Sequence, residues 1–112
     1  MFARVSRQSL NKAAISYHDD LVESLRGDEE AQIEYIKACF EENGDIPSVI
    51  LSAIRTVAEA RGFKNFAETA ELNRENLYRI LSDGGNPRLD TFFKILDALN
   101  LRLSVESKLK VA

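Results

Sequence analysis

Nucleophilic catalysis requires a Cys or Ser held against a His and an orienting acid, and this chain offers few such groups. Cys39 and His18 are the single cysteine and the single histidine among 112 residues. Cys39 falls on the apolar face of a predicted helix, and His18 stands far before it. The acidic residues form no calcium-binding loop, and Gly84-Gly85 lacks the preceding strand and following Lys of a phosphate-binding loop. We therefore expect a non-enzymatic protein with no metal site and no cofactor.

A stronger pattern lies between Asn65 and Ser82, where two short predicted helices are separated by about three residues. So short a connection forces a sharp crossing, as in a helix-turn-helix, whose second helix enters the DNA major groove. The positions that must face inward are apolar: Phe66, Ala67, Ala70, Leu72, Leu77 and Ile80. This spacing favours a DNA-binding unit, and the alternative is a generic three-helix corner with a solvated face.

The outward face of the second helix carries side chains that can read base edges. Arg forms bidentate hydrogen bonds to guanine, Asn does so to adenine, and Glu accepts from cytosine. The predicted base-reading residues are Arg74, Glu75, Asn76, Tyr78 and Arg79. Residues that flank the two helices can bind phosphates, and this predicted set is Lys64, Asn65, Asn86 and Arg88. Asn86 has a competing role in shaping the turn before Pro87.

The other elements follow from apolar spacing and capping residues. Helices are predicted over about 19–25, 29–43, 46–61, 66–70, 74–82 and 89–99. Asp28, Asp45 and Asn73 are the predicted N-caps, Asn65 with Glu68 has the spacing of a capping box, and Pro47 suits a first helical turn.

Residues 101–105 alternate apolar and polar side chains, which is the period of a short β-strand. A single strand in a helical domain would leave its edge unpaired. We therefore expect it to pair with a second copy of the chain, and the predicted dimerisation residues are Leu101, Leu103 and Val105.

Charge is distributed unevenly along the sequence, although the net charge is only −3. Residues 1–18 carry three basic groups and no acid, and they are predicted to form a flexible basic arm. Residues 19–45 carry ten acidic groups against two basic ones, and residues 46–112, the predicted DNA-binding core, are slightly basic. The acidic extension suits a basic partner, with Glu29, Glu30 and Glu34 as contacts; the alternative is a set of solvated helix faces.

The sequence also bears on the compartment. No apolar run approaches the ~20 residues of a membrane span, and the first residues lack the apolar core of a secretory signal. A single cysteine excludes an intramolecular disulfide. We expect a reducing cytoplasm and no membrane contact.

Several short motifs point to a known family. They are Ala60-Arg61-Gly62, Asn73-Arg74-Glu75-Asn76-Leu77-Tyr78, Leu81-Ser82, Gly85-Asn86-Pro87-Arg88, Thr91 and Ala98-Leu99. With them, the run 53–105 resembles the addiction-module antidote family, a HigA-like branch of the Cro- and phage-repressor-type helix-turn-helix proteins. The acidic stretch 20–45 resembles the region that these antitoxins carry ahead of their DNA-binding core, so the likeness covers about residues 17–107.

Together the residue patterns and the resemblance predict an all-α fold. It is a lambda-repressor-like helix-turn-helix bundle with a short N-terminal helical extension and a C-terminal β-strand. The resemblance implies a homodimeric repressor that binds an inverted repeat in its own promoter and neutralises a basic, RelE-like ribonuclease toxin by direct binding. The charge distribution places the toxin contacts at Glu29, Glu30 and Glu34. The alternatives are a stand-alone or prophage-type repressor without a toxin, and a protein-interaction module that does not bind DNA.

Two positions depart from the family's pattern. The family usually has Gly in the turn where this chain has Glu71, and it favours Gly where Asn100 stands. If the turn position needs a positive φ, Glu costs roughly 1 kcal/mol relative to Gly and could tilt the recognition helix.

Overall fold

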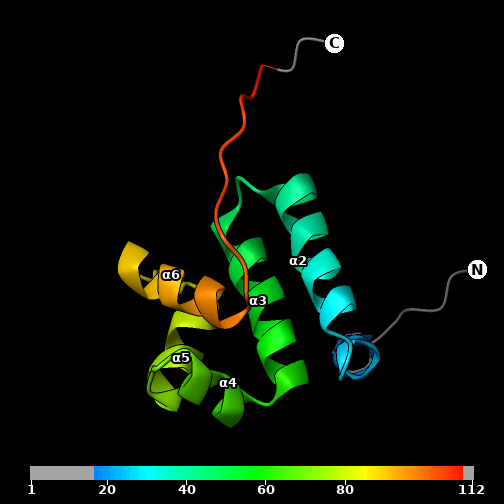
Figure 1. The fold of residues 1–112 in the computed structure, drawn as a ribbon, viewed down its shortest axis with the longest axis vertical. Coiled ribbons are helices and arrows are strands. Elements are labelled where there is room, and N and C mark those ends of the chain that lie inside the picture. Colours follow the sequence, from blue (N-terminus) through cyan, green and yellow to red (C-terminus); the bar gives the residue numbers. More distant parts are fainter. Residues whose placement is uncertain (1–16, 110–112) are drawn as a thin grey trace, which may run out of the picture.

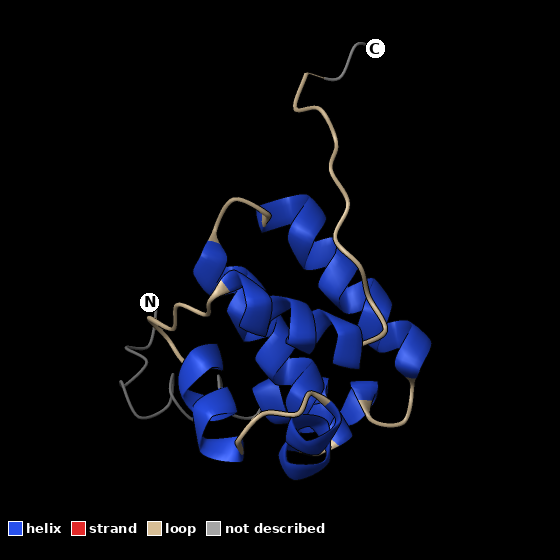
Figure 2. Cartoon of the chain, turned by 60° about the vertical axis from the view of Figure 1, so that its left-hand side comes forward, coloured by secondary structure: helices blue, strands red, loops and turns tan. Residues whose placement is uncertain are grey.

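A computed structural model describes residues 17–109, and all of their regular structure is helical (Figures 1 and 2). Helical residues 17–25 come first. They are followed by α2 (Glu29–Asn43), α3 (Pro47–Arg61), α4 (Phe63–Thr69), α5 (Arg74–Leu81) and α6 (Leu89–Ala98). The all-α prediction is confirmed for this part of the chain. The predicted arm lies outside the described residues, except that residues 17 and 18 are already helical.

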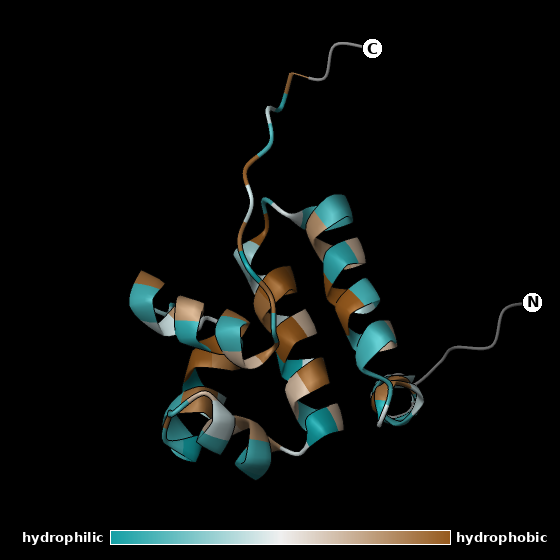
Figure 3. Cartoon of the chain, viewed as in Figure 1, coloured by the Kyte–Doolittle hydropathy of each residue, from teal (hydrophilic) through white to brown (hydrophobic). Residues whose placement is uncertain are grey.

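Helix α3 is the centre of the molecule. In Figure 1 it lies between α2 on one side and α4, α5 and α6 on the other. Its buried residues spread around most of its circumference, as expected for a helix covered on several sides: Ile50, Leu51, Ala53, Ile54, Thr56, Val57, Ala58 and Ala60. Figure 3 shows the same contrast, with apolar residues along α3 and hydrophilic ones along the outer side of α2.

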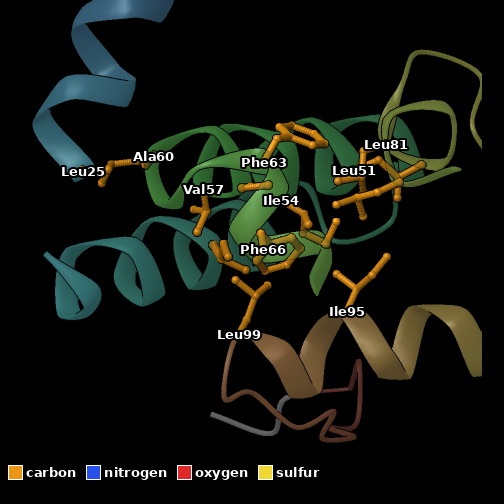
Figure 4. Close-up of a cluster of buried hydrophobic side chains, with 14 of the residues drawn as sticks. Leu25, Leu51, Ile54, Val57, Ala60, Phe63, Phe66, Leu81, Ile95 and Leu99 are labelled. Carbon is orange, nitrogen blue, oxygen red and sulfur yellow. The ribbon is translucent and has the colours of Figure 1, made fainter. Parts of the chain in front are cut away.

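One apolar core joins the acidic extension to the rest of the chain. Val22, Leu25 and Ile36 belong to the same cluster of buried side chains as Leu77 and Leu99. Figure 4 shows Ile95 of α6 and Leu99, the residue after it, pointing toward Ile54 and Phe66, while Leu25 lies on the other side, beside Ala60. The extension is therefore part of a single packed unit.

Capping side chains fix two helix starts as predicted. The Asp28 carboxylate accepts a hydrogen bond from the Ala31 N–H at 3.0 Å, which caps α2. The Asn73 side chain accepts from the N–H groups of Glu75 and Asn76, at 2.8 and 3.3 Å, which caps α5. Each bond satisfies a donor that has no partner inside the helix.

The other two capping predictions are wrong. Pro47 occupies the first position of α3, so Ile46 is the N-cap by position and the Asp45 side chain plays no part. Gly62, at φ 89°, both ends α3 and begins α4. Helix α4 therefore starts at Phe63, three residues earlier than predicted, and Asn65 lies within it rather than before it.

Helices α4 and α6 end in the same way, with a Schellman motif. After α4, the Leu72 N–H donates to the Ala67 carbonyl and the Glu71 N–H donates to the Glu68 carbonyl, at 2.9 and 3.1 Å. After α6, Leu101 and Asn100 repeat this pattern with the carbonyls of Leu96 and Asp97, at 2.8 and 2.9 Å. The motif requires a left-handed residue, and Glu71 and Asn100 adopt it at φ 57° and 61°.

The predicted C-terminal β-strand is wrong. Beyond Leu101, no backbone hydrogen bond to another described segment holds residues 102–109, which run away from the helices (Figure 1). A β-strand is defined by a paired neighbour, and this all-helical chain supplies none among its described residues. The Leu101 N–H instead donates to the Leu96 carbonyl in the last turn of α6.

A tight turn follows α5. Gly84 has φ 80° with open space around it, whereas Gly85 packs closely on the backbone: a Cβ there would overlap the carbonyl oxygen of Ile80. This turn directs the chain from α5 into α6.

Candidate nucleic-acid interface

Helix α5 is anchored on one face and free on the other. Leu77 and Leu81 are 0% and 1% exposed, and both lie in the core with α3. Phe66, Ala67 and Ala70 are also buried, as predicted for the inward face, while Leu72 and Ile80 are partly buried. Leu81 was assigned to the predicted helix but was not included among its inward-facing residues, so the sequence analysis missed its place in the core.

Four of the predicted base-reading residues are exposed on the free face of α5: Arg74, Glu75, Asn76 and Arg79. The Arg79 guanidinium donates through Nη2 to Oδ1 of Asn76 at 3.0 Å. This bond leaves the amide NH2 group of Asn76 and the remaining guanidinium N–H groups of Arg79 available to a ligand.

Tyr78 is placed differently from the other four. Its ring stacks on Phe63 of α4, with ring centroids 4.0 Å apart and an angle of 15° between the planes. The side chain remains 45% exposed. Tyr78 therefore couples α5 to the start of α4, and only its outer part can meet a ligand.

The predicted phosphate-binding residues flank this face. Lys64 and Asn65 are exposed in the first turn of α4, directly after the Phe63 ring that Tyr78 covers. Asn86 and Arg88 are exposed between α5 and α6. Arg88 lies 3.4 Å, Nε to Oδ1, from Asp90, so its charge is partly balanced by a neighbour that solvent also reaches.

A second charged surface lies on α2, on the other side of α3 from α5 (Figure 1). The predicted contact residues Glu29, Glu30 and Glu34 are all exposed there. Glu29 also lies 3.9 Å from Nη2 of Arg61 at the end of α3. Glu30 and Glu34 form no ion pair among the described residues.

Comparison with known proteins shows the family of the chain. A family model described as "probable addiction module antidote protein" matches residues 16–107. The chain belongs to this family. It is also 39% identical, over 87 residues, to an uncharacterised protein of Haemophilus influenzae, a match that covers 78% of this chain and 87% of that relative. No solved structure matches.

Membership of the antidote family implies a cognate toxin as partner. The family's finer features, a HigA-like branch and a helix-turn-helix that binds DNA, remain predictions. Within the part of the chain that the structure describes, no helix is both long and apolar enough to cross a membrane.

The two groups considered for catalysis, His18 and Cys39, contact different residues. The His18 imidazole lies 2.7 Å from a carboxylate oxygen of Glu59 on α3. Burial raises the pKa of the Cys39 thiol, although a hydrogen bond with Tyr35 opposes this shift, and a raised pKa disfavours the reactive thiolate. Among residues 17–109, no three His, Cys, Asp or Glu side chains are grouped to hold a metal ion.

The three predicted dimerisation residues differ in exposure. Leu101 is partly buried against the core, whereas Leu103 and Val105 are 45% and 96% exposed. The two exposed side chains leave apolar surface uncovered on the described chain.

Sequence reasoning missed a buried polar network in the antidote. The Gln32 side chain, only 3% exposed, donates to the Leu25 carbonyl at 2.8 Å and accepts from Nε of Arg61 at 2.7 Å. Nη1 of Arg61 donates to the Ala98 carbonyl at 3.2 Å. A signal was present in the sequence, because Gln32 precedes Ile36 by four positions and so shares its buried side of α2.

Proposed function

We propose that this antidote is a homodimeric, sequence-specific DNA-binding antitoxin of the HigA-like branch. In this proposal α4, the Schellman turn and α5 form a helix-turn-helix that represses the antidote's own operon. A separate acidic surface neutralises a basic, RelE-like ribonuclease toxin. The proposal assigns the chain no catalytic reaction.

The observation that carries the DNA-binding proposal is the free face of α5. Arg74, Asn76 and Arg79 project from a helix whose opposite side is fixed by fully buried leucines. A rigid helix with exposed Arg and Asn side chains suits bidentate readout of guanine and adenine. Tyr78, held by Phe63, suits a contact at the edge of the site rather than a base at its centre.

The phosphate contacts follow from the same orientation. If α5 enters the major groove, α4 crosses the DNA backbone, and Lys64 and Asn65 are exposed on its first turn. Arg88 would approach the backbone from the other end of α5, after giving up its weak pairing with Asp90. These contacts add affinity and orientation without sequence preference.

The toxin-binding proposal is supported by charge and by separation. Glu30 and Glu34 are exposed on α2 without ion-pair partners among the described residues. A basic partner would be steered to such a surface by long-range attraction. Because α3 separates α2 from α5, one chain could hold toxin and operator together.

The dimer proposal uses the exposed apolar groups of the C-terminal segment. Leu103 and Val105 are more exposed than Leu101, and a second copy would cover them. A two-fold dimer would place two recognition helices about 34 Å apart, one turn of DNA.

The proposal is tested by comparing two single variants on two DNA fragments. Arg74→Ala should lose about 1–3 kcal/mol of binding to DNA from upstream of the gene, and lose discrimination against a scrambled fragment. Lys64→Ala is the matched control: it should weaken both fragments equally and lower the salt slope by about one.

Titrations at several salt concentrations give both quantities. If the native chain binds both fragments alike, α5 does not read bases and the DNA-binding proposal fails. If Arg74→Ala retains full discrimination, Arg74 has no reading role.

A further inference from the structure

Arg61, the last residue of α3, joins three elements that are distant in the sequence. Its Nε donates to Gln32 of α2 and its Nη1 donates to the carbonyl of Ala98, the last residue of α6. The last carbonyls of a helix have no partner within it, and a cation near this end also interacts favourably with the helix dipole. Arg61 therefore holds α6 at its C-terminal end.

The residues that follow Ala98 set the course of the C-terminal segment. The N–H groups of Leu99, Asn100 and Leu101 all donate back to carbonyls of the last turn of α6. Because Ala98 lies inside this turn, a shift of its carbonyl moves the point from which residues 102–109 depart. The hold of Arg61 on Ala98 thus bears on the direction of Leu103 and Val105.

The third guanidinium nitrogen of Arg61 is poorly satisfied. Nη2 is buried and forms no hydrogen bond, and the closest ion-pairing group among the described residues is Oε1 of Glu29 at 3.9 Å. The Arg61 side chain is 21% exposed, so loss of the Glu29 charge would leave a mostly buried cation less compensated.

A partner can reach Glu29 without disturbing the core. The Glu29 side chain is 63% exposed, and it borders an open depression of about 410 Å³ that Arg61, Asn65 and Ala98 also line. A cationic side chain of a bound protein could therefore pair with Glu29 and compete with Arg61 for it.

We infer that Arg61 is a positioning residue for the C-terminal segment and that Glu29 controls how firmly it holds Ala98. A cationic group of a partner that pairs with Glu29 weakens this hold and loosens the end of α6. The inference rests on the proposed function in one respect: that function gives the C-terminal segment its role, which is dimerisation on the operator. The coupling itself concerns contacts within one chain and is tested without DNA or toxin.

The test is amide hydrogen exchange in the full chain, measured for Leu99, Asn100 and Leu101. Glu29→Gln removes the carboxylate charge beside Arg61. Its matched control is Glu30→Gln, which removes the same charge one residue away, where no ion pair with Arg61 is formed among the described residues. We expect Glu29→Gln to speed exchange at these three amides roughly two- to five-fold, with Glu30→Gln unchanged.

Arg61→Met extends the test by removing both hydrogen bonds while keeping an unbranched apolar stem. It should speed exchange at the same amides roughly tenfold or more relative to those of Ile54 and Val57 in α3. If this variant fails to fold, the comparison of Glu29→Gln with Glu30→Gln decides alone. Equal exchange in those two variants overturns the inference, whether or not the antidote binds DNA.

Discussion

The acidic extension and the α4–α5 unit both pack against α3, but they are attached by different interactions. Helix α5 buries two leucines completely. Helix α2 buries one isoleucine and one glutamine, and the glutamine is bonded to Arg61 of α3. Apolar burial stabilises in proportion to the area buried, and close packing of the buried side chains holds the helix in one position. A hydrogen bond, even to a charged group, contributes less free energy than two fully buried leucines.

This difference suits the two proposed tasks. A recognition helix must keep its exposed side chains in register with base edges, and a helix anchored by fully buried side chains does so. A surface that meets a partner mainly through charge needs less exact placement, because electrostatic steering acts over several ångströms. The polar attachment of α2 also leaves a contact, Glu29 with Arg61, that a charged partner can alter.

The largest expected effect is on the free energy of unfolding, and it compares the apolar attachment of α5 with the polar attachment of α2. Leu77→Ala should lower the free energy of unfolding by about 3–5 kcal/mol, since Leu77 is fully buried and its loss leaves a cavity. Gln32→Leu should cost less, about 1–3 kcal/mol, because Arg61 and the Leu25 carbonyl each lose a partner.

Urea unfolding measures both variants, and Glu30→Gln, exposed on α2, should stay within about 0.5 kcal/mol of the native chain. A Gln32→Leu cost equal to that of Leu77→Ala would show that the polar attachment is as strong as the apolar one.

The next effect separates the two surfaces by partner. Reversal of Glu30 and Glu34 to Lys should weaken binding of the neighbouring gene's basic product by roughly tenfold at low salt, mainly by slowing association. Glu29 is left unchanged because of its contact with Arg61. DNA binding should change little, apart from a small non-specific gain.

Association kinetics at low and high salt, with Arg74→Ala as the reciprocal control, check this expectation. Native rates at every salt concentration would show that the acids of α2 are only a solvated helix face.

The smallest effect concerns the two Schellman turns. Glu71→Gly should stabilise the chain by about 0.5–1 kcal/mol, because glycine adopts φ 57° without the steric cost that Glu bears there. Asn100→Gly should gain less, since Asn tolerates the left-handed region. Thermal unfolding compares the two, and a larger gain at Asn100 would contradict the strain assigned to Glu71.

Local patterns were readable from the sequence where one residue decided the structure. Asp28 and Asn73 cap their helices and Leu77 faces inward, all as predicted. The energetic cost predicted for Glu71 if its turn position has a positive φ also applies, because its φ is positive. Each of these depends on the residue itself and its closest neighbours in the chain.

What the sequence did not reveal depends on residues far apart. Asp45 has the right type for a cap but the wrong position, since Pro47 fixes Ile46 as the cap. The alternation over 101–105 is a strand pattern, yet no described segment lies beside it to accept hydrogen bonds. Arg61 and Gln32 are polar residues whose burial makes sense only once α2, α3 and α6 are placed together.

The two adjacent glycines after α5 are required for different reasons, and so they limit substitution to different degrees. At Gly84 the constraint is a backbone angle, φ 80°, which Asn or Asp can also adopt at modest cost. At Gly85 it is space, because any side chain would strike the Ile80 carbonyl. In relatives that keep this turn between α5 and α6, we therefore expect Asn or Asp to be tolerated at the position of Gly84. We expect only glycine at the position of Gly85.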